Sequence, residues 1–257
     1  MKPARLILLL WLGALALWTV WRPHDPLAVS PARQFQPPSS EHWLGTDRLG
    51  RDVFSRTGLA LKRTLVQAGL AEIAGFAASL LVAAVVIVQE RRVPALAASA
   101  RALLLALRTL PPFLVALSLA VFLRDSFPGV VAALFALSFI FSQPVYEAEL
   151  AQAVRHPAVE GAITLGANPG RVVRAYLLPL VLPRLLRYAV LDFASLVAFA
   201  ALFSFVGLTA PPQPSLGEML YEARAYLTVY PWLFLAPTGA LVLLLVGLWS
   251  FKPETQG

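Results

Sequence analysis

Long apolar stretches separated by shorter polar segments make up most of the chain. Each stretch lies near the roughly 20 residues that a helix needs to cross a ~30 Å hydrocarbon layer, and a helix satisfies its own backbone groups in lipid. The apolar stretches are Leu6–Trp21, Leu65–Val88, Leu103–Leu123, Gly129–Val145, Tyr188–Leu208 and Trp232–Phe251. The pattern predicts an all-α polytopic membrane protein with six transmembrane helices.

The composition agrees with this class and excludes others. Hydrophobic residues make up 58% of the 257 residues, charged residues 14%, and the mean hydropathy is +0.71. Soluble chains have about 45 to 50% apolar residues, so this excess is too large for one water-soluble core and also excludes disorder. The absence of cysteine removes disulfides and thiolate chemistry, and three histidines argue against a His-rich metal centre.

The net charge of +7 bears on orientation more than on nucleic-acid binding, because basic residues of membrane proteins gather in cytoplasmic loops. With a cytoplasmic amino terminus, six spans place both termini in the cytoplasm, the loop Arg22–Arg63 outside and the loop Tyr146–Arg187 inside. Twelve of the 21 Lys and Arg residues then lie inside and nine outside. This small excess favours that topology, and we expect lipid but no nucleic acid as a partner.

The first apolar stretch has two interpretations. It ends with Trp18 and Trp21, which suit the interface of a membrane anchor. A cleaved signal peptide is the alternative, but the apolar run passes directly into Arg22 and Pro23 without a small-residue cleavage site. We therefore expect an anchor helix.

The inner loop has the punctuation of two short helices between His156 and Pro183. Pro157 suits a first helical turn, where its missing N–H is not needed, and Gly166 suits the left-handed position after a helix end. Asn168 before a proline then predicts the cap of a second helix. We expect a helix-turn-helix that protrudes from the membrane.

The spacing within this loop resembles the EAA loop of the membrane subunits of bacterial ABC importers. Glu160-Gly161-Ala162 is followed after three residues by Gly166, and after nine more by Tyr176-Leu177-Leu178-Pro179. The resemblance implies a type I importer fold with a cytoplasmic coupling loop, residues 156–183, that docks on an ATPase subunit. The residues it assigns to ATPase coupling are Glu160, Gly161, Ala162, Gly166, Leu178 and Pro179. An ordinary amphipathic connector is the alternative.

A second resemblance lies in the outer loop. The run from His42 to Arg56 is similar to the HPLGTDxxGRDxxSR signature of the dipeptide, oligopeptide and nickel branch of these permeases, and Phe205 to Trp232 resembles a later run of that branch. The motif residues are Gly45, Thr46, Asp47, Gly50, Arg51 and Asp52. The order of the signatures implies the second permease subunit of a heterodimer, with an anchor helix and external loop over residues 1–64 and the permease domain over 65–257.

The outer motif also has a direct physical interpretation. Its glycines supply turns, and its Thr and Asp residues cap helices or close turns beside arginines. Two roles stay open, a self-contained ion-paired loop on the membrane surface and a contact with a solute-binding protein. The chain departs from the branch pattern at Pro144 and Glu147, where arginines are usual, and in its short tail, Lys252–Gly257.

Glu72, Gln143 and Asp192 fall inside predicted spans, where such polar groups are costly and often functional. Glu72 and Asp192 are candidates for lining a substrate pathway, although each could lie near a span end. Gln143 has the simpler interpretation of a hydrogen-bonded bridge between helices.

Motifs of catalysis are missing from the sequence, since it has no phosphate-binding loop, no G-x-S-x-G elbow and no H-E-x-x-H. The resemblance implies a permease subunit for peptides in a bacterial plasma (inner) membrane rather than an enzyme. It also implies a second permease, two ATPase subunits and a solute-binding protein as partners, with ATP and magnesium used by the ATPases and no cofactor on this chain. The alternatives are a permease for nickel or another small solute, an ATP-independent secondary transporter, and an intramembrane enzyme.

Overall fold

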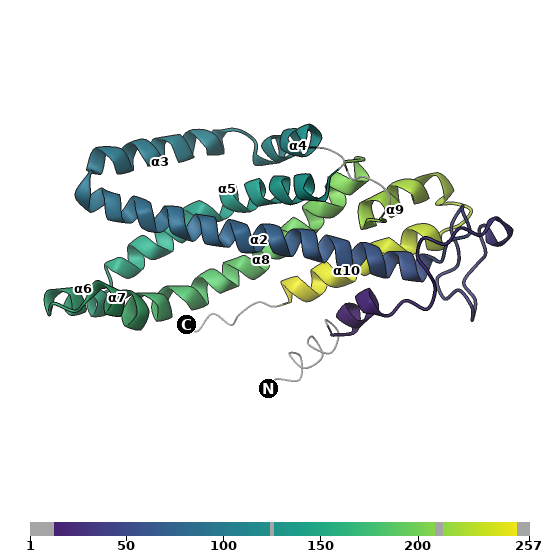
Figure 1. The fold of residues 1–257 in the computed structure, drawn as a ribbon, viewed down its shortest axis with the longest axis horizontal. Coiled ribbons are helices and arrows are strands. Elements are labelled where there is room, and N and C mark those ends of the chain that lie inside the picture. The colour runs from purple at the N-terminus through teal and green to yellow at the C-terminus, as the bar shows by residue number, and fades with distance from the viewer. Residues whose placement is uncertain (1–12, 124–125, 209–212, 251–257) are drawn as a thin grey trace.

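The computed structural model describes residues 13–123, 126–208 and 213–250, and the described part of the chain is helical. Residues 13–20 form a helix, and the elements that follow are α2 (Val53–Arg92), α3 (Pro94–Thr109), α4 (Pro112–Phe122), α5 (Phe127–Val154), α6 (Pro157–Thr164), α7 (Pro169–Val172), α8 (Leu178–Phe205), α9 (Leu216–Ala223) and α10 (Trp232–Trp249). Figure 1 shows an elongated bundle in which α6 and α7 lie at one end and α9 lies toward the other. We call these the α6–α7 end and the α9 end.

Four of the helices are long and apolar enough to cross a membrane, namely Val53–Glu90, Phe127–Val154, Gly170–Phe205 and Trp232–Trp249. They confirm the second, fourth, fifth and sixth predicted spans and the all-α membrane class. Large apolar side chains such as Leu81, Leu103 and Leu235 are more than 60% exposed on the bundle surface, as expected for side chains that face lipid.

The span predicted over Leu103–Leu123 is not one continuous helix. This segment is divided between α3 and α4, which are bent by 81° to each other. Leu110 has the extended dihedral angles φ −72° and ψ 136°, because a following proline disfavours the helical conformation. Two prolines at 111 and 112 thus end one helix and begin the next, and the described residues contain four spans, or five if the bent pair is one span.

The first predicted span, Leu6–Trp21, lies partly outside the described residues. Its described end packs on α2 at Gly58, where an added Cβ would overlap the Trp18 carbonyl oxygen. The Trp18 indole N–H donates to the Phe54 carbonyl at 3.2 Å, and the two rings stack at 5.0 Å. The end of this helix is therefore held against the start of α2.

Both long loops are shorter than predicted, because the helices beside them are longer. α2 begins at Val53 rather than Leu65, so residues 64 and 65 lie inside one continuous helix. At the other end, α5 extends to Val154 and α8 begins at Leu178, although Pro144 and Pro183 lie inside these helices. Apolar burial on both sides of each proline outweighs the one backbone hydrogen bond that it removes.

The second helix of the inner loop is also not independent, which corrects the predicted helix-turn-helix. α7 has four residues and continues through a π-helical turn, Val173–Leu177, into α8. Residues 155–177 thus project beyond α5 and α8, and we call this segment the finger. It is joined to α8 by continuous helix.

The core lies where α2 crosses α5 and α8, and small residues let these helices approach. A Cβ at Gly75 would overlap the Ser138 hydroxyl of α5. Ala60, Ala71 and Ala133 are fully buried at these contacts. Close backbone approach through small residues is the usual way in which helices associate in membranes.

Candidate functional site

The first candidate site is the finger at the α6–α7 end. The His156 imidazole caps α6 by accepting from the Ala158 N–H at 3.3 Å, and Gly166 ends the turn with φ +74°. The Ala167 N–H then donates to the Ala162 carbonyl at 3.0 Å, which closes the helix end. The sequence-predicted turn at Gly166 is therefore present.

The finger has a small core and an open outer face. Ala162 is buried against Val159 and Val172, whereas Glu160 and Pro179 are exposed. A Cβ at Gly161 or at Gly166 would meet no atom within 4 Å, so nothing in the described chain covers these glycines. Of the six residues assigned to coupling, Ala162 packs inward and the other five lie on exposed surface, with Leu178 39% exposed.

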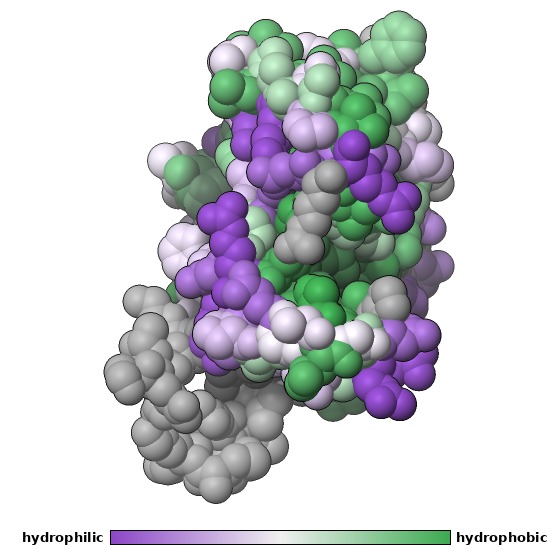
Figure 2. Space-filling model, turned by 90° about the vertical axis from the view of Figure 1, so that its left-hand side faces the viewer, coloured by the Kyte–Doolittle hydropathy of each residue, from purple (hydrophilic) through white to green (hydrophobic). Residues whose placement is uncertain are grey.

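Two apolar residues extend the open face and were missed in the sequence. Leu165, the cap of α6, is 88% exposed, and Ile163 is 44% exposed. The sequence holds a signal for Leu165, since this apolar residue stands directly before the glycine that ends the helix. Figure 2 looks at this end of the molecule, where hydrophilic residues gather around a hydrophobic hollow. A recess lined by residues of α5 and by Arg155, His156 and Pro157 opens beside the finger.

The second candidate site is the outer motif at the α9 end. An isolated antiparallel bridge joins Thr46 to Asp52, and Gly45 and Gly50 on this turn have φ of +72° and +71°. The Asp52 carboxylate caps α2 by accepting from the Ser55 N–H at 2.8 Å. The predicted turns and cap are present, and the loop leads directly into α2.

Charged side chains of the outer motif form ion pairs with one another and with Glu222, which is distant in the sequence. The Asp47 carboxylate accepts from the Leu49 and Arg51 backbone N–H groups and pairs with the Arg51 guanidinium at 2.6 Å and with Arg56 of α2 at 3.4 Å. On the other side, Glu222 of α9 pairs with Arg51 at 3.3 Å and with Arg56 at 3.6 Å. We call these four side chains the ion cluster.

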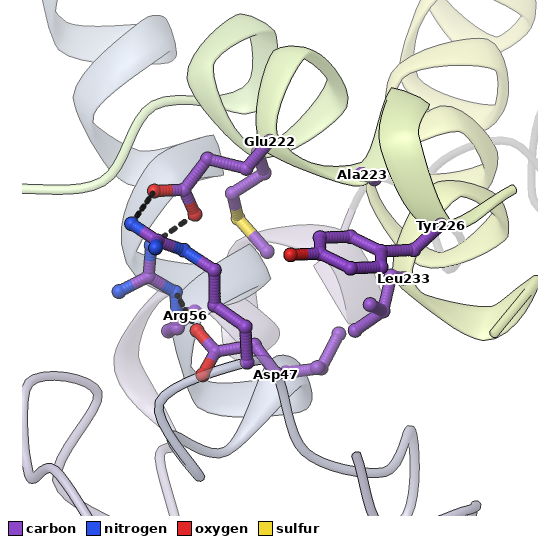
Figure 3. Close-up of a pocket in the computed structure, with 9 residues that line it drawn as sticks. Asp47, Arg56, Glu222, Ala223, Tyr226 and Leu233 are labelled. Carbon is purple, nitrogen blue, oxygen red and sulfur yellow. Dashed lines mark ion pairs between the residues drawn. The ribbon is translucent and has the colours of Figure 1, made fainter. Parts of the chain in front are cut away.

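Figure 3 shows the pocket above this cluster. Glu222 and Asp47 approach Arg56 from opposite sides, while the Tyr226 ring extends into the pocket from the segment after α9. The pocket is small and has an apolar wall that includes Leu233 of α10. The motif residues are thus turned onto this chain's own α2 and α9, with side-chain exposures of 11% for Asp47 and 13% for Arg51.

Glu218 lies on α9 one turn before Glu222. Burial raises the pKa of its carboxyl group, the nearby Glu222 charge raises it further, and Arg56 and Arg63 oppose the shift. One carboxyl oxygen, Oε2, is buried without a hydrogen-bond partner in the described chain. The folded protein therefore disfavours the ionised form of Glu218 relative to the same group in water.

The polar residues predicted inside spans lie within the bundle. The Glu72 carboxylate accepts from the Ser138 hydroxyl at 3.2 Å, and Asp192 is hydrogen-bonded to Ser142, one turn along the same face of α5. Glu72 is only 7% exposed. Both carboxyl groups therefore connect α5 to its neighbours within this chain.

Gln143 bridges helices, in agreement with its simpler interpretation. It is hydrogen-bonded to Arg108 of α3, and its amide N–H donates to the Glu147 carboxylate at 2.9 Å. Arg101 of α3 pairs with Glu147 at 2.6 Å and with Glu90 of α2 at 2.8 Å. The acidic residue that departs from the branch pattern thus takes its basic partner from α3.

Comparisons with known proteins agree with this architecture. A family model for the binding-protein-dependent transport system inner membrane component matches residues 75–251. A putative peptide permease protein of Brucella suis is 33% identical over 90% of this chain and 77% of its own length. A probable D,D-dipeptide transport system permease protein of Escherichia coli K12, DdpC, is 30% identical over 87% of this chain and 74% of its own length.

Two solved structures have the same fold. The MetNI methionine ABC transporter in an inward-facing conformation gives a TM-score of 0.63 at 21% identity, over 76% of this chain and 92% of that one. An amino acid ABC transporter with histidines gives 0.59 at 18% identity, over 76% of this chain and 89% of that one. The fold is that of type I importer permeases.

The chain belongs to the family of binding-protein-dependent transport system inner membrane components. It is a membrane subunit of an ABC importer, and its curated relatives are permease proteins of peptide and dipeptide systems rather than enzymes.

Proposed function

We propose that this chain is one of two permease subunits through which an ATP-driven importer moves di- and oligopeptides across the inner membrane. The open outer face of the finger carries this proposal, because its glycines and exposed apolar residues form a surface that no other part of the described chain covers. The names of the relatives supply the substrate class. A second permease, two ATPase subunits and a solute-binding protein complete the assembly.

The α6–α7 end faces the cytoplasm in this proposal, the α9 end faces outward, and both termini are cytoplasmic. Because the chain has no cysteine, single cysteines can report its orientation. In intact spheroplasts a membrane-impermeant maleimide should label Glu41→Cys, on the exposed outer loop, and should label Leu165→Cys only after permeabilisation. Labelling of Leu165→Cys in intact spheroplasts would reverse the orientation.

The finger docks on an ATPase subunit, and closure of the two ATPases moves it. Helix continues from Gly170 through the π-helical turn to Phe205, so a force on the finger passes directly into α8. The hydrogen bond between Asp192 and Ser142 ties α8 to α5, which carries the motion into the bundle. Alternation between inward-open and outward-open forms is the expected result.

Docking is tested with a matched pair of glycine substitutions. Gly161 and Gly239 both lie in helices, and an added Cβ at either would meet no atom within 4 Å. Gly161→Trp should abolish co-purification of the ATPase in mild detergent, while Gly239→Trp, on α10, should retain it. Retention by Gly161→Trp, or no ATPase bound to the unaltered chain, would contradict the docking surface.

The substrate class is tested by uptake into proteoliposomes that contain the whole transporter. Radiolabelled dipeptides and oligopeptides should enter in an ATP-dependent manner that requires the solute-binding protein. Entry of Ni²⁺ without entry of any peptide would assign the chain to the alternative substrate class. Peptide uptake without ATP would instead favour the secondary transporter.

A further inference from the structure

Two histidines and an aspartate meet at the α9 end, beside the outer motif. His24 follows the first helix, His42 lies before the turn, and Asp52 caps α2. Their three candidate ligand atoms all lie within 4.8 Å of one another, and His42 and Asp52 are buried. Three histidines in the sequence argued against a His-rich metal centre, but folding brings two of them together with an aspartate.

The spacing of these atoms is near that of a tetrahedral metal centre. Asp52 Oδ1 lies 2.8 Å from His42 Nδ1 and 3.8 Å from His24 Nδ1. Bonds of about 2.0 to 2.2 Å to a tetrahedral ion place its ligand atoms about 3.3 to 3.6 Å apart. One separation must therefore lengthen and the other shorten by about half an ångström, which side-chain rotation can supply.

The protein leaves one of these ligand atoms available for a cation and holds the other two together. His24 Nδ1 is buried without a hydrogen-bond partner in the described chain. Asp52 uses Oδ2 for the helix cap, and its Oδ1 is hydrogen-bonded to His42 Nδ1, the bond that a cation between these two atoms would replace. The imidazole rings of His24 and His42 pack with centroids 4.7 Å apart, so both rings lie at the same point of the outer motif.

One neighbour must adjust when a metal binds. Arg33 Nη1 lies 3.4 Å from His42 Nε2 and pairs with Glu41 at 2.7 Å. Without metal, His42 accepts from Arg33 at Nε2 and donates its Nδ1 proton to Asp52. A metal takes the Nδ1 lone pair, so the ring proton moves to Nε2 and the exposed Arg33 side chain turns to Glu41 alone.

We propose that His24, His42 and Asp52 form a Zn²⁺ site, with water as the fourth ligand. Two imidazole nitrogens and one carboxylate oxygen suit zinc, whereas Mg²⁺ and Ca²⁺ prefer sites built from oxygen. The ion fastens the segment after the first helix to the outer motif and to the start of α2. The site lies apart from the finger and does not depend on the peptide as substrate.

The test measures Zn²⁺ binding to the purified full chain in detergent, without a polyhistidine tag and after dialysis against a chelator. The unaltered chain should bind one Zn²⁺ and unfold at a higher temperature when it is added, while Mg²⁺ has no effect. His24→Ala should weaken binding by at least about tenfold and remove the thermal shift. His156→Ala, which removes the third histidine at the opposite end of the molecule, should bind as the unaltered chain does.

Two further measurements test the same site. Asp52→Asn retains the helix cap, because asparagine caps as well as aspartate, but should also weaken Zn²⁺ binding by at least about tenfold. Co²⁺ should give the visible absorption of a tetrahedral site in the unaltered chain and not in His24→Ala. Equal binding by His24→Ala, loss of binding in His156→Ala, or no stoichiometric Zn²⁺ would overturn the site.

Discussion

The two ends of the molecule both carry signature motifs, but they present them in opposite ways. At the α6–α7 end most motif residues face outward, with Gly161 and Gly166 in open space. At the α9 end the motif is turned inward, where Asp47 and Arg51 join charges of α2 and α9. The outward motif is suited to docking and the inward one to holding the fold. A recognisable spacing alone does not distinguish the two roles.

The largest expected effect of substitution lies in the ion cluster. Asp47→Ala removes the acceptor of two backbone N–H groups and one of the two carboxylates that pair with Arg56, which is buried, and with Arg51, which is partly buried. We therefore expect a loss of about 3 to 5 kcal/mol in the free energy of unfolding. Denaturation in detergent measures this loss. Glu41→Ala breaks the exposed Arg33 pair instead and should cost less than about 1 kcal/mol. Equal effects of the two variants would show that the cluster does not hold the fold.

Two glycines with the same backbone conformation sharpen the comparison. Gly50 and Gly166 have φ of +71° and +74°, but a Cβ at Gly50 would overlap the Ser30 carbonyl oxygen and one at Gly166 would meet nothing. Gly50→Ala should therefore cost about 2 to 4 kcal/mol, the sum of backbone strain and steric overlap, and Gly166→Ala only about 1 to 2 kcal/mol. Thermal unfolding of both variants checks this order. A larger loss of stability in Gly166→Ala than in Gly50→Ala would contradict the difference in crowding at the two turns.

The exposed tip of the finger should affect binding without affecting stability. Leu165→Ser removes an apolar side chain that is 88% exposed, so the unfolding free energy should change by less than about 0.5 kcal/mol. Affinity for the ATPase should fall roughly tenfold if Leu165 is an anchor of the interface. Phe122→Ser, on α4 and 86% exposed, is a control that should leave ATPase affinity unchanged.

The smallest expected effect concerns Glu218. Its pKa is raised in the folded state, so the folded protein is relatively more stable below the unfolded-state pKa and loses this advantage as the pH rises through the folded-state pKa. Glu218→Gln should therefore be slightly more stable than the unaltered chain above that pH, by up to about 1 kcal/mol, and equal to it in acid. Melting temperatures measured across a pH series test this, and a variant that is less stable at neutral pH would contradict it.

Periodicity and local chemistry predicted much of the fold. Hydropathy located four of the long helices, since an apolar segment of this length must form a helix in lipid. Gly166 was predicted as a helix end, and Asp52 as a helix cap or a turn residue, because these roles depend on a few neighbouring residues. The bend between α3 and α4 was not predicted, although Pro111 and Pro112 indicate it. A hydropathy average over about 20 residues does not detect a break of two residues.

Partners distant in the sequence could not be predicted. Nothing near Asp47 indicates that Glu222 of α9 shares its arginines, and nothing near His24 indicates His42 and Asp52. The same holds for Glu72, whose carboxylate meets a serine of α5 inside the bundle.

The sequence by itself determined the membrane class, the positions of most spans, the turns of both motifs and the resemblance to importer permeases. These depend on hydrophobic length and on backbone preferences, which are local. Only the tertiary structure decided which motif faces outward, which charges neutralise each other and which histidines meet. Those outcomes depend on how helices far apart in the chain pack. Gly75, for example, allows close packing only because Ser138 of another helix lies against it, and the sequence around Gly75 does not show that neighbour.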